Sequence, residues 1–210
     1  MIQKLKPIKV QENLRQQGLL LFTPKELRRA FQVKPPAAQQ FLKNHAKTEE
    51  GIFMKLRNGK YILRHHLPSP YLAANKLYEP SYVSLETALS YYSIIPEVVY
   101  SITSVTTKNT REFITPWLAF TYHKIKKTAF TGYCLIKNQG QGVLMAEPEK
   151  ALVDYLYFVN TRGNNLNDRL ELKKLSRGKI ENYAKLFSRP GLLRLIDKVY
   201  AEYKKPRVIY

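Results

Sequence analysis

The stretch GIFMKLRNGKYILR, residues 51–64, contains two β-compatible runs on either side of Asn58-Gly59. This dipeptide is the strongest short-range signal for a two-residue type I′ turn, in which both central residues need a positive φ. We therefore expect a tight antiparallel β-ribbon over Ile52–Arg57 and Lys60–Arg64. One face of such a ribbon can pack on a core while its cations lie toward solvent or an anionic partner. Because side chains alternate along a strand, one face would carry Phe53, Lys55 and Arg57, and the other Ile52, Met54 and Leu56.

Three helices are predicted upstream of the ribbon, and the first ends near Gly18. The second begins at Thr23, which serves as its N-cap, and Glu26 completes a capping box. It should end near Phe31, because a Val-Lys-Pro sequence follows and a residue before proline avoids the α region. The third helix starts at Pro36. Its inward stripe consists of Ala37, Ala38, Phe41 and Leu42.

The opposite face of the third helix is polar and partly cationic. Helix, helix, short turn, helix and basic ribbon is the order of a winged helix-turn-helix, which we expect at residues 1–66. Glutamine and asparagine can pair with adenine edges, whereas lysine and arginine suit phosphates. The alternative is a solvated helix face beside an ordinary edge hairpin. The predicted DNA-contacting residues are Gln39, Gln40, Lys43, Asn44, Lys47, Lys55, Arg57, Asn58 and Lys60.

Net charge supports a polyanionic partner. The chain of 210 residues has 35 Lys+Arg against 16 Asp+Glu, a formal charge of +19. Such an imbalance favours nucleic acid or an acidic surface as the partner. The charge is uneven: residues 1–66 carry +10, residues 67–160 carry +1 and residues 161–210 carry +8. Double-stranded DNA is the partner we expect for the first segment.

Cysteine and histidine usage argues against a metal or disulfide framework. Cys134 is the single cysteine, and no Cys or His cluster has metal-ligand spacing, so we expect no cofactor. His65-His66 would point to opposite sides of an extended chain, and His45 is expected to pack at a core edge. No apolar run reaches the length of a membrane span, and the first ten residues lack a secretory pattern. A cytoplasmic location without membrane contact is therefore expected.

The second part of the chain is predicted to be a mixed α/β domain ending in helices, at residues 71–210. The sequence of residues 67–70, Leu-Pro-Ser-Pro, is typical of a stiff linker. We expect DNA binding on its N-terminal side and toxin-related function on its C-terminal side, and we expect residues 1–70 to fold alone. A helix is expected over Tyr71–Leu77, another after Ser84, a third from Pro148, and two more near the end. The whole chain is thus assigned to the α+β class. Strands are expected over Val98–Val105, Arg111–Thr115, Ala119–His123, Phe130–Leu135 and Gly142–Met145.

Four segments of this second part carry a resemblance to a known family: YEPSYVSLETALSYYSIIPE (78–97), YSITSVTTKNTREF (100–113), FTYHKI (120–125) and MAEPEKALVDYLYF (145–158). They resemble the C-terminal domain of the AbiEi-type antitoxins, and the N-terminal order of elements is similar to theirs. The family resemblance covers most of residues 10–160. It implies a bacterial regulator of an abortive-infection toxin-antitoxin operon, which represses its own promoter at inverted repeats and counters a nucleotidyltransferase toxin.

Two other functions compete with this interpretation. One is a repressor without a toxin partner. The other is a metal-dependent nuclease, because Asp154 followed by Glu171-Leu172-Lys173 echoes a D…ExK arrangement in which carboxylates hold a divalent ion. The triplet lies in a polar stretch that would not preorganise it, and Asp154 reads as part of a surface ion pair. We therefore expect no catalytic residues.

Overall fold

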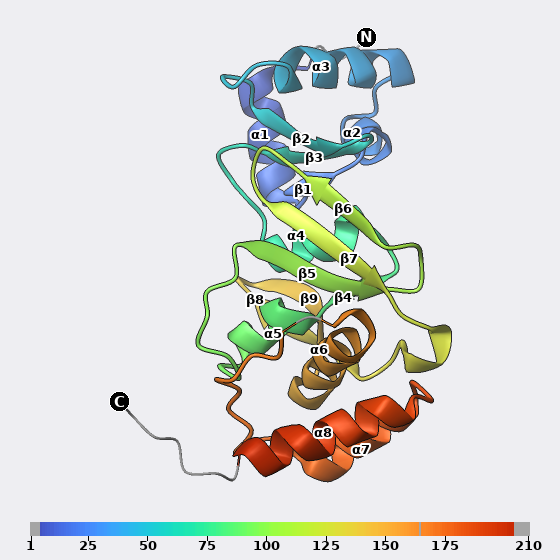
Figure 1. Cartoon of the computed structure of the whole chain (residues 1–210). Helices are drawn as coiled ribbons and strands as arrows, with labels where there is room; N and C mark the ends of the chain where they lie inside the picture. The colour runs from blue at the N-terminus through green and yellow to red at the C-terminus, as the bar shows by residue number, and fades with distance from the viewer. Residues whose placement is uncertain (1–4, 164, 204–210) are drawn as a thin grey trace.

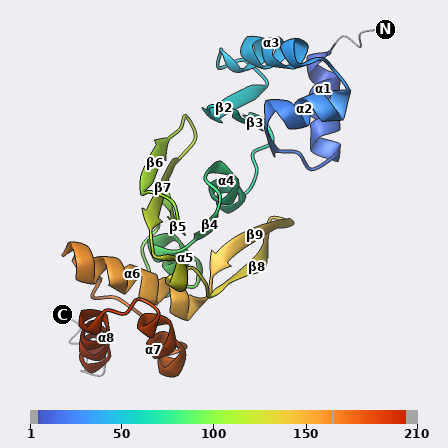
Figure 2. The same cartoon turned by 90° about the vertical axis from the view of Figure 1, so that its right-hand side faces the viewer.

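The computed structural model describes residues 5–163 and 165–203, and the described chain is a mixed α+β protein with eight α-helices and two β-sheets. This confirms the predicted class. The molecule is elongated: α3 (Pro35–Ala46) lies at one end, and α7 (Arg177–Lys185) and α8 (Pro190–Tyr203) lie at the other (Figures 1 and 2). No helix within the described residues is long and apolar enough to cross a membrane.

Residues 5–66, called the N-terminal region below, form three helices and a small sheet of order β1-β3-β2. The predicted capping box is confirmed: the Glu26 N–H donates to Thr23 Oγ1 (3.2 Å), and the Thr23 N–H donates to Glu26 Oε2 (2.7 Å). The short strand β1, which pairs with β3, was not foreseen. The elements besides α3 are α1 (Pro7–Gln16), β1 (Leu21–Phe22), α2 (Pro24–Phe31), β2 (Phe53–Arg57) and β3 (Lys60–Leu63).

The turn of the ribbon differs from the prediction. Gly59 has a φ of +75°, but Asn58 is not among the residues with positive φ, so the type I′ assignment is wrong. The pairing of β2 with β3 also shifts register between Lys55 and Arg57. An extra residue on one strand and a glycine in the left-handed region are typical of a bulged hairpin loop. Positive φ at two successive central residues occurs instead at Gln139-Gly140 (+50° and +74°).

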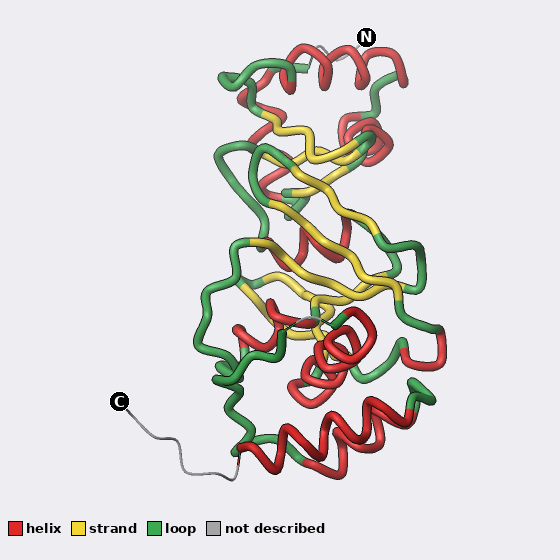
Figure 3. The backbone as a smooth tube through the Cα atoms, viewed as in Figure 1, coloured by secondary structure: helices red, strands yellow, loops and turns green. Residues whose placement is uncertain are grey.

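Described residues from 67 onward, called the C-terminal region, contain a six-stranded sheet of order β6-β7-β5-β4-β9-β8. Helix α4 packs on one face against β4, β5 and β9, and α5 and α6 cover the other, with α7 and α8 stacked on α6 (Figures 2 and 3). The helices here are α4 (Pro70–Leu77), α5 (Leu85–Tyr91) and α6 (Pro148–Arg162), besides the 3₁₀ turn Lys127–Ala129. The strands are β4 (Ser81–Val83), β5 (Ser101–Thr106), β6 (Arg111–Ile114), β7 (Ala119–Lys124), β8 (Tyr133–Asn138) and β9 (Gln141–Ala146).

Two predicted strands are displaced, and β4 was not predicted. The strand expected from Val98 begins at Ser101, because Val98 and Tyr100 are exposed in a loop. The strand expected from Phe130 begins at Tyr133, after the 3₁₀ turn. In both cases the predicted strand includes residues before the part that pairs with a neighbouring strand. Pairing, rather than local propensity, sets these strand limits.

The segment of residues 67–70 is packed rather than free. Pro68 and Ser69 are buried. The Ser69 N–H donates to Gln141 Oε1 (2.8 Å), and Ser69 Oγ donates to Asn138 Oδ1 (2.6 Å). These bonds anchor the junction to the hairpin of β8 and β9.

The β2–β3 ribbon buries side chains on both faces. Phe53 and Leu63 belong to the apolar core of the N-terminal region, which also contains Phe22. Three ribbon residues belong to the core of the C-terminal region instead: Met54, Leu56 and Ile62. The expectation that one face stays free for solvent or an anion is therefore wrong, because the second face packs on the C-terminal region.

Candidate nucleic-acid interface

The polar face of α3 is exposed along the helix. Ala38, Phe41 and Leu42 are buried beneath it, as the sequence predicts. His45 packs its ring on Phe41, with ring centroids 4.4 Å apart, so the core-edge assignment is confirmed. The helix lies at the free end of the molecule (Figure 1). Its exposed outward residues are Gln39, Gln40, Lys43 and Asn44, with Lys47 at the C-cap.

Two amides on this face are held together. Gln40 Nε2 donates to Asn44 Oδ1 at 2.8 Å, one helical turn away. The bond leaves Gln40 Oε1 and the Asn44 amide N–H₂ available, which is one acceptor and one donor group. A donor and an acceptor side by side are what the major-groove edge of adenine requires.

Helix α2 adds cations beside α3 that sequence reasoning did not assign to the site. Lys25 and Arg28 border an open groove of about 270 Å³ between α2 and α3, together with Gln39 and two prolines. Lys25 is exposed, and Arg28 is partly exposed. The sequence contains a signal for this pair of cations. Lys25 and Arg28 are three residues apart, so they share one face of α2, and Leu27 occupies the inward face.

The ribbon residues predicted to touch DNA fall into two groups. Lys55 and Asn58 are exposed. Arg57 instead lies over the ring of Phe113 at 5.2 Å, and Lys60 Nζ lies 4.0 Å from Glu79 Oε2. Two cations of the ribbon thus contact the C-terminal region, on the side away from α3.

The loop from α3 to the ribbon is fixed by Arg64. Its Nε donates to the Gly51 carbonyl (3.0 Å) and its Nη2 to the Thr48 carbonyl (3.2 Å). A Cβ at Gly51 would lie 2.3 Å from the His45 carbonyl oxygen, so only glycine fits this close approach. Arg64 therefore has a structural role that sets the position of α3 relative to β2.

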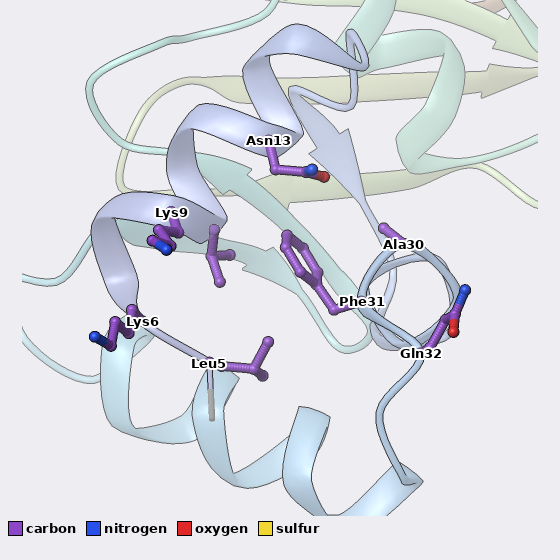
Figure 4. A pocket seen from close by; sticks show the side chains of 8 residues that line it. Leu5, Lys6, Lys9, Asn13, Ala30, Phe31 and Gln32 are labelled. Carbon is purple, nitrogen blue, oxygen red and sulfur yellow. The ribbon is translucent and has the colours of Figure 1, made fainter. Parts of the chain in front are cut away.

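A second groove, of about 590 Å³, runs between α1 and the end of α2 (Figure 4). Phe31 and Leu5 point into it, whereas the amine of Lys6 points away. Its lining holds amides and lysines but neither a carboxylate nor a histidine. The groove lacks paired acid and base groups for proton transfer.

The polar cluster with the deepest burial lies in the C-terminal region. Lys150 and Asp154, one turn apart on α6, form a fully buried ion pair, which corrects the expected surface pair. Tyr82 Oη (3.1 Å) and Ser84 Oγ (2.8 Å) donate to the other Asp154 oxygen. Burial raises the pKa of the Asp154 carboxyl and lowers the pKa of the Lys150 amine, whereas their mutual attraction acts in the opposite direction on each.

The carboxylates considered for a nuclease are bound to neighbouring groups. Asp154 has both oxygens occupied, and Glu171 accepts hydrogen bonds from the Lys173 N–H (3.0 Å) and from the Tyr203 hydroxyl. Within residues 5–163 and 165–203, no group of three or more His, Cys, Asp or Glu residues is arranged to hold a metal ion.

Comparison with known proteins adds no assignment. No model of a known protein family matches the sequence, and a search of curated proteins also finds no match.

Proposed function

We propose that the protein is a DNA-binding transcriptional regulator whose residues 1–66 act as a winged helix-turn-helix. In this proposal α3 enters the major groove, with Gln39, Gln40 and Asn44 toward base edges. The observation that carries the proposal is the exposed polar face of α3 at the free end of the molecule, with the cations of α2 beside it. The order of elements and the charge of +10 on residues 1–66 support it.

The phosphate contacts are assigned to cations near α3. Arg57 and Lys60 contact Phe113 and Glu79, so they hold the ribbon on the C-terminal region and rank below the others as DNA ligands. Five other cations lie on α2, on or at the end of α3, and on β2, and five phosphate contacts are enough to fix register on a duplex without reading sequence. They are Lys25, Arg28, Lys43, Lys47 and Lys55.

The resemblance to AbiEi-type antitoxins extends the proposal. On that basis the regulator represses its own promoter and is an antitoxin that counters a nucleotidyltransferase toxin through its C-terminal region. The proposal includes no catalysis and a cytoplasmic bacterial setting. Co-expression of the full chain with a nucleotidyltransferase encoded beside it should restore growth, and failure to restore growth would leave a repressor without a toxin partner.

Titration of a labelled promoter duplex at several salt concentrations tests DNA binding. With about five phosphate contacts, log K should fall against log salt with a slope of about −4 to −5. A flat salt response, or equal affinity for promoter and scrambled duplex, contradicts the proposal.

Substitutions on α3 separate base reading from phosphate contact. Gln40→Ala or Asn44→Ala should weaken promoter binding by about 1–3 kcal/mol and leave binding to random DNA nearly unchanged. Lys43→Ala should weaken both alike. Gln16→Ala removes an exposed amide from α1 and serves as the matched control. Equal losses in promoter and random-DNA binding for the amide variants would mean that α3 does not read bases.

A further inference from the structure

Strand β8 forms an unprotected edge of the six-stranded sheet. It pairs with β9 along its full length without a register shift, and among the described residues no strand pairs with its other side. It lies at the margin of the molecule in Figure 2. Edge strands expose unpaired N–H and C=O groups, and proteins usually guard them with charge, proline, bulges or a covering element. Strand β8 contains no proline, and Lys137 is its one charged residue.

The opposite edge, β6, shows such protection. It has four residues, of which Arg111 and Glu112 are charged and exposed. The ring of Phe113 lies under two cations, Arg57 at 5.2 Å and Arg111 at 5.8 Å. The edge strand β6 is therefore protected by charged residues, whereas the edge strand β8 is open for pairing with another strand.

The open edge also exposes apolar surface. Leu135 is 71% exposed although it lies in the middle of the strand. It borders a groove of about 400 Å³ whose other walls include Leu72 of α4, Leu144 of β9 and Phe130. A strand added beyond β8 would cover Leu135 and continue this apolar surface. The missing neighbour is thus an extended segment with apolar side chains.

We propose that this neighbour is β8 of a second copy, paired antiparallel about a two-fold axis at Leu135. Residues opposite each other in an antiparallel pair share a face, so this register sets Leu135 against Leu135 of the second copy. It also sets Tyr133 against Lys137 of the second copy, and Cys134 against Ile136. The pairing joins two six-stranded sheets into one.

Side-chain chemistry favours a second copy of this strand as the occupant. No like charges meet in this register, although the chain as a whole is strongly basic. Each Lys137 lies opposite a Tyr133 ring, which packs on Tyr82 (4.5 Å) and Phe130 (5.5 Å) and stays 36% exposed, so a cation can reach it. Apolar and cation–aromatic pairs directly across strands are stabilising. The inference does not depend on DNA binding, and its test contains no DNA.

Sedimentation of the full chain across a concentration series tests the proposal. The wild type should be a dimer, and Leu135→Lys should sediment as a monomer, because two lysines would then face each other across the axis. Ile114→Lys is the matched control, since Ile114 is 82% exposed on the guarded edge β6. Both side chains are solvent-exposed in the single chain, so thermal unfolding midpoints should stay close to that of wild type. A monomeric wild type, or a dimer that survives Leu135→Lys, overturns the proposal.

Cross-linking tests the register. In a Cys134→Ser background, Leu135→Cys should form a disulfide-linked dimer under mild oxidation, because residues directly opposite have Cα atoms within disulfide range. Ile114→Cys in the same background measures random collision. Comparable cross-linking of the two variants contradicts the proposed register.

Discussion

The core of the N-terminal region contains only apolar side chains, whereas the core of the C-terminal region encloses the Lys150–Asp154 pair and several hydroxyl groups. The N-terminal region carries its polar chemistry outside, on α3. The C-terminal region carries much of its own inside, where Tyr82 and Ser84 complete the network around Asp154. Substitutions of polar residues should therefore change binding in the first region and stability in the second.

The border between these two cores does not follow the proline-rich junction. It runs through the ribbon, because Phe53 packs on one core while Met54 and Leu56 pack on the other. The ribbon therefore connects the two cores and is also the candidate wing. We call this connection through the ribbon the joint.

The largest effect is expected from cutting the chain at the junction. A fragment of residues 1–70 exposes Met54, Leu56 and Ile62, and burial of each such side chain contributes about 1.5–3 kcal/mol. The fragment should therefore unfold at a much lower temperature than the full chain, as measured by circular dichroism. This revises the expectation, from sequence, of an independently folding N-terminal domain.

Leu56→Glu provides the control for the fragment experiment. It should destabilise the full chain strongly, because Leu56 is buried against the C-terminal region. In the fragment the same change should have little effect. Equal unfolding temperatures for fragment and full chain would refute a shared core.

The second effect concerns the buried ion pair. Asp154→Ala leaves the Lys150 amine buried without its partner and should cost about 3–5 kcal/mol of unfolding free energy in urea titration. The double change Lys150→Met with Asp154→Leu should recover part of this loss, because no charge is left buried, although the Tyr82 and Ser84 hydroxyls lose their acceptor. Glu202→Ala removes one partner of the exposed pair Lys198–Glu202, also one helical turn apart, and should cost at most about 1 kcal/mol. Similar losses of unfolding free energy for Asp154→Ala and Glu202→Ala would contradict the proposed difference between buried and exposed polar groups.

The features that sequence predicted correctly are those set by neighbouring residues. The capping box at Thr23 and Glu26 needs only contacts three residues apart, and the inward stripe of α3 needs only helical periodicity. Both were predicted within one or two residues. The exposed polar face of α3, which is the centre of the candidate site, follows from the same periodicity.

The features that sequence missed depend on contacts between distant segments. The residues next to Arg57 and Lys60 in the sequence give no sign of the contacts with Phe113 and Glu79. Both cations were therefore predicted to be available for DNA. Asp154 sits four residues from a lysine on a helix, a spacing equally typical of a surface pair. Its burial depends on Tyr82, which comes from β4. The periodicity of a sequence predicts which side chains share one face of a helix or strand. It does not predict which distant segment packs on that face.

Acid titration should produce a smaller effect at His123. Burial, together with the nearby Arg162 guanidinium, lowers the pKa of His123 to about 4. The unfolded histidine, with an ordinary pKa of about 6.5, takes up its proton first as pH falls. The stability contributed by neutral His123 is therefore present above about pH 6.5 and is lost as pH falls toward 4.

Urea unfolding at about pH 7 and about pH 5 tests this contribution. His123→Asn should reduce the loss of stability between the two conditions, whereas His65→Asn, at an exposed histidine, should leave it unchanged. An identical loss in the wild type and His123→Asn would show that His123 does not contribute to acid sensitivity.

The smallest effect concerns the contact between Arg57 and Phe113 at the joint. A double-mutant cycle with Arg57→Ala and Phe113→Leu should give a coupling of about 0.5–1 kcal/mol in unfolding free energy, as for an exposed cation–aromatic pair. Arg57→Ala should at the same time change DNA affinity less than Lys43→Ala, because its guanidinium is directed to the C-terminal region. If Arg57→Ala instead weakens DNA binding as much as Lys43→Ala and shows no coupling to Phe113, then Arg57 leaves the ring to contact phosphate. The tip of the ribbon would in that case contact DNA while Met54, Leu56 and Ile62 stay packed on the C-terminal region.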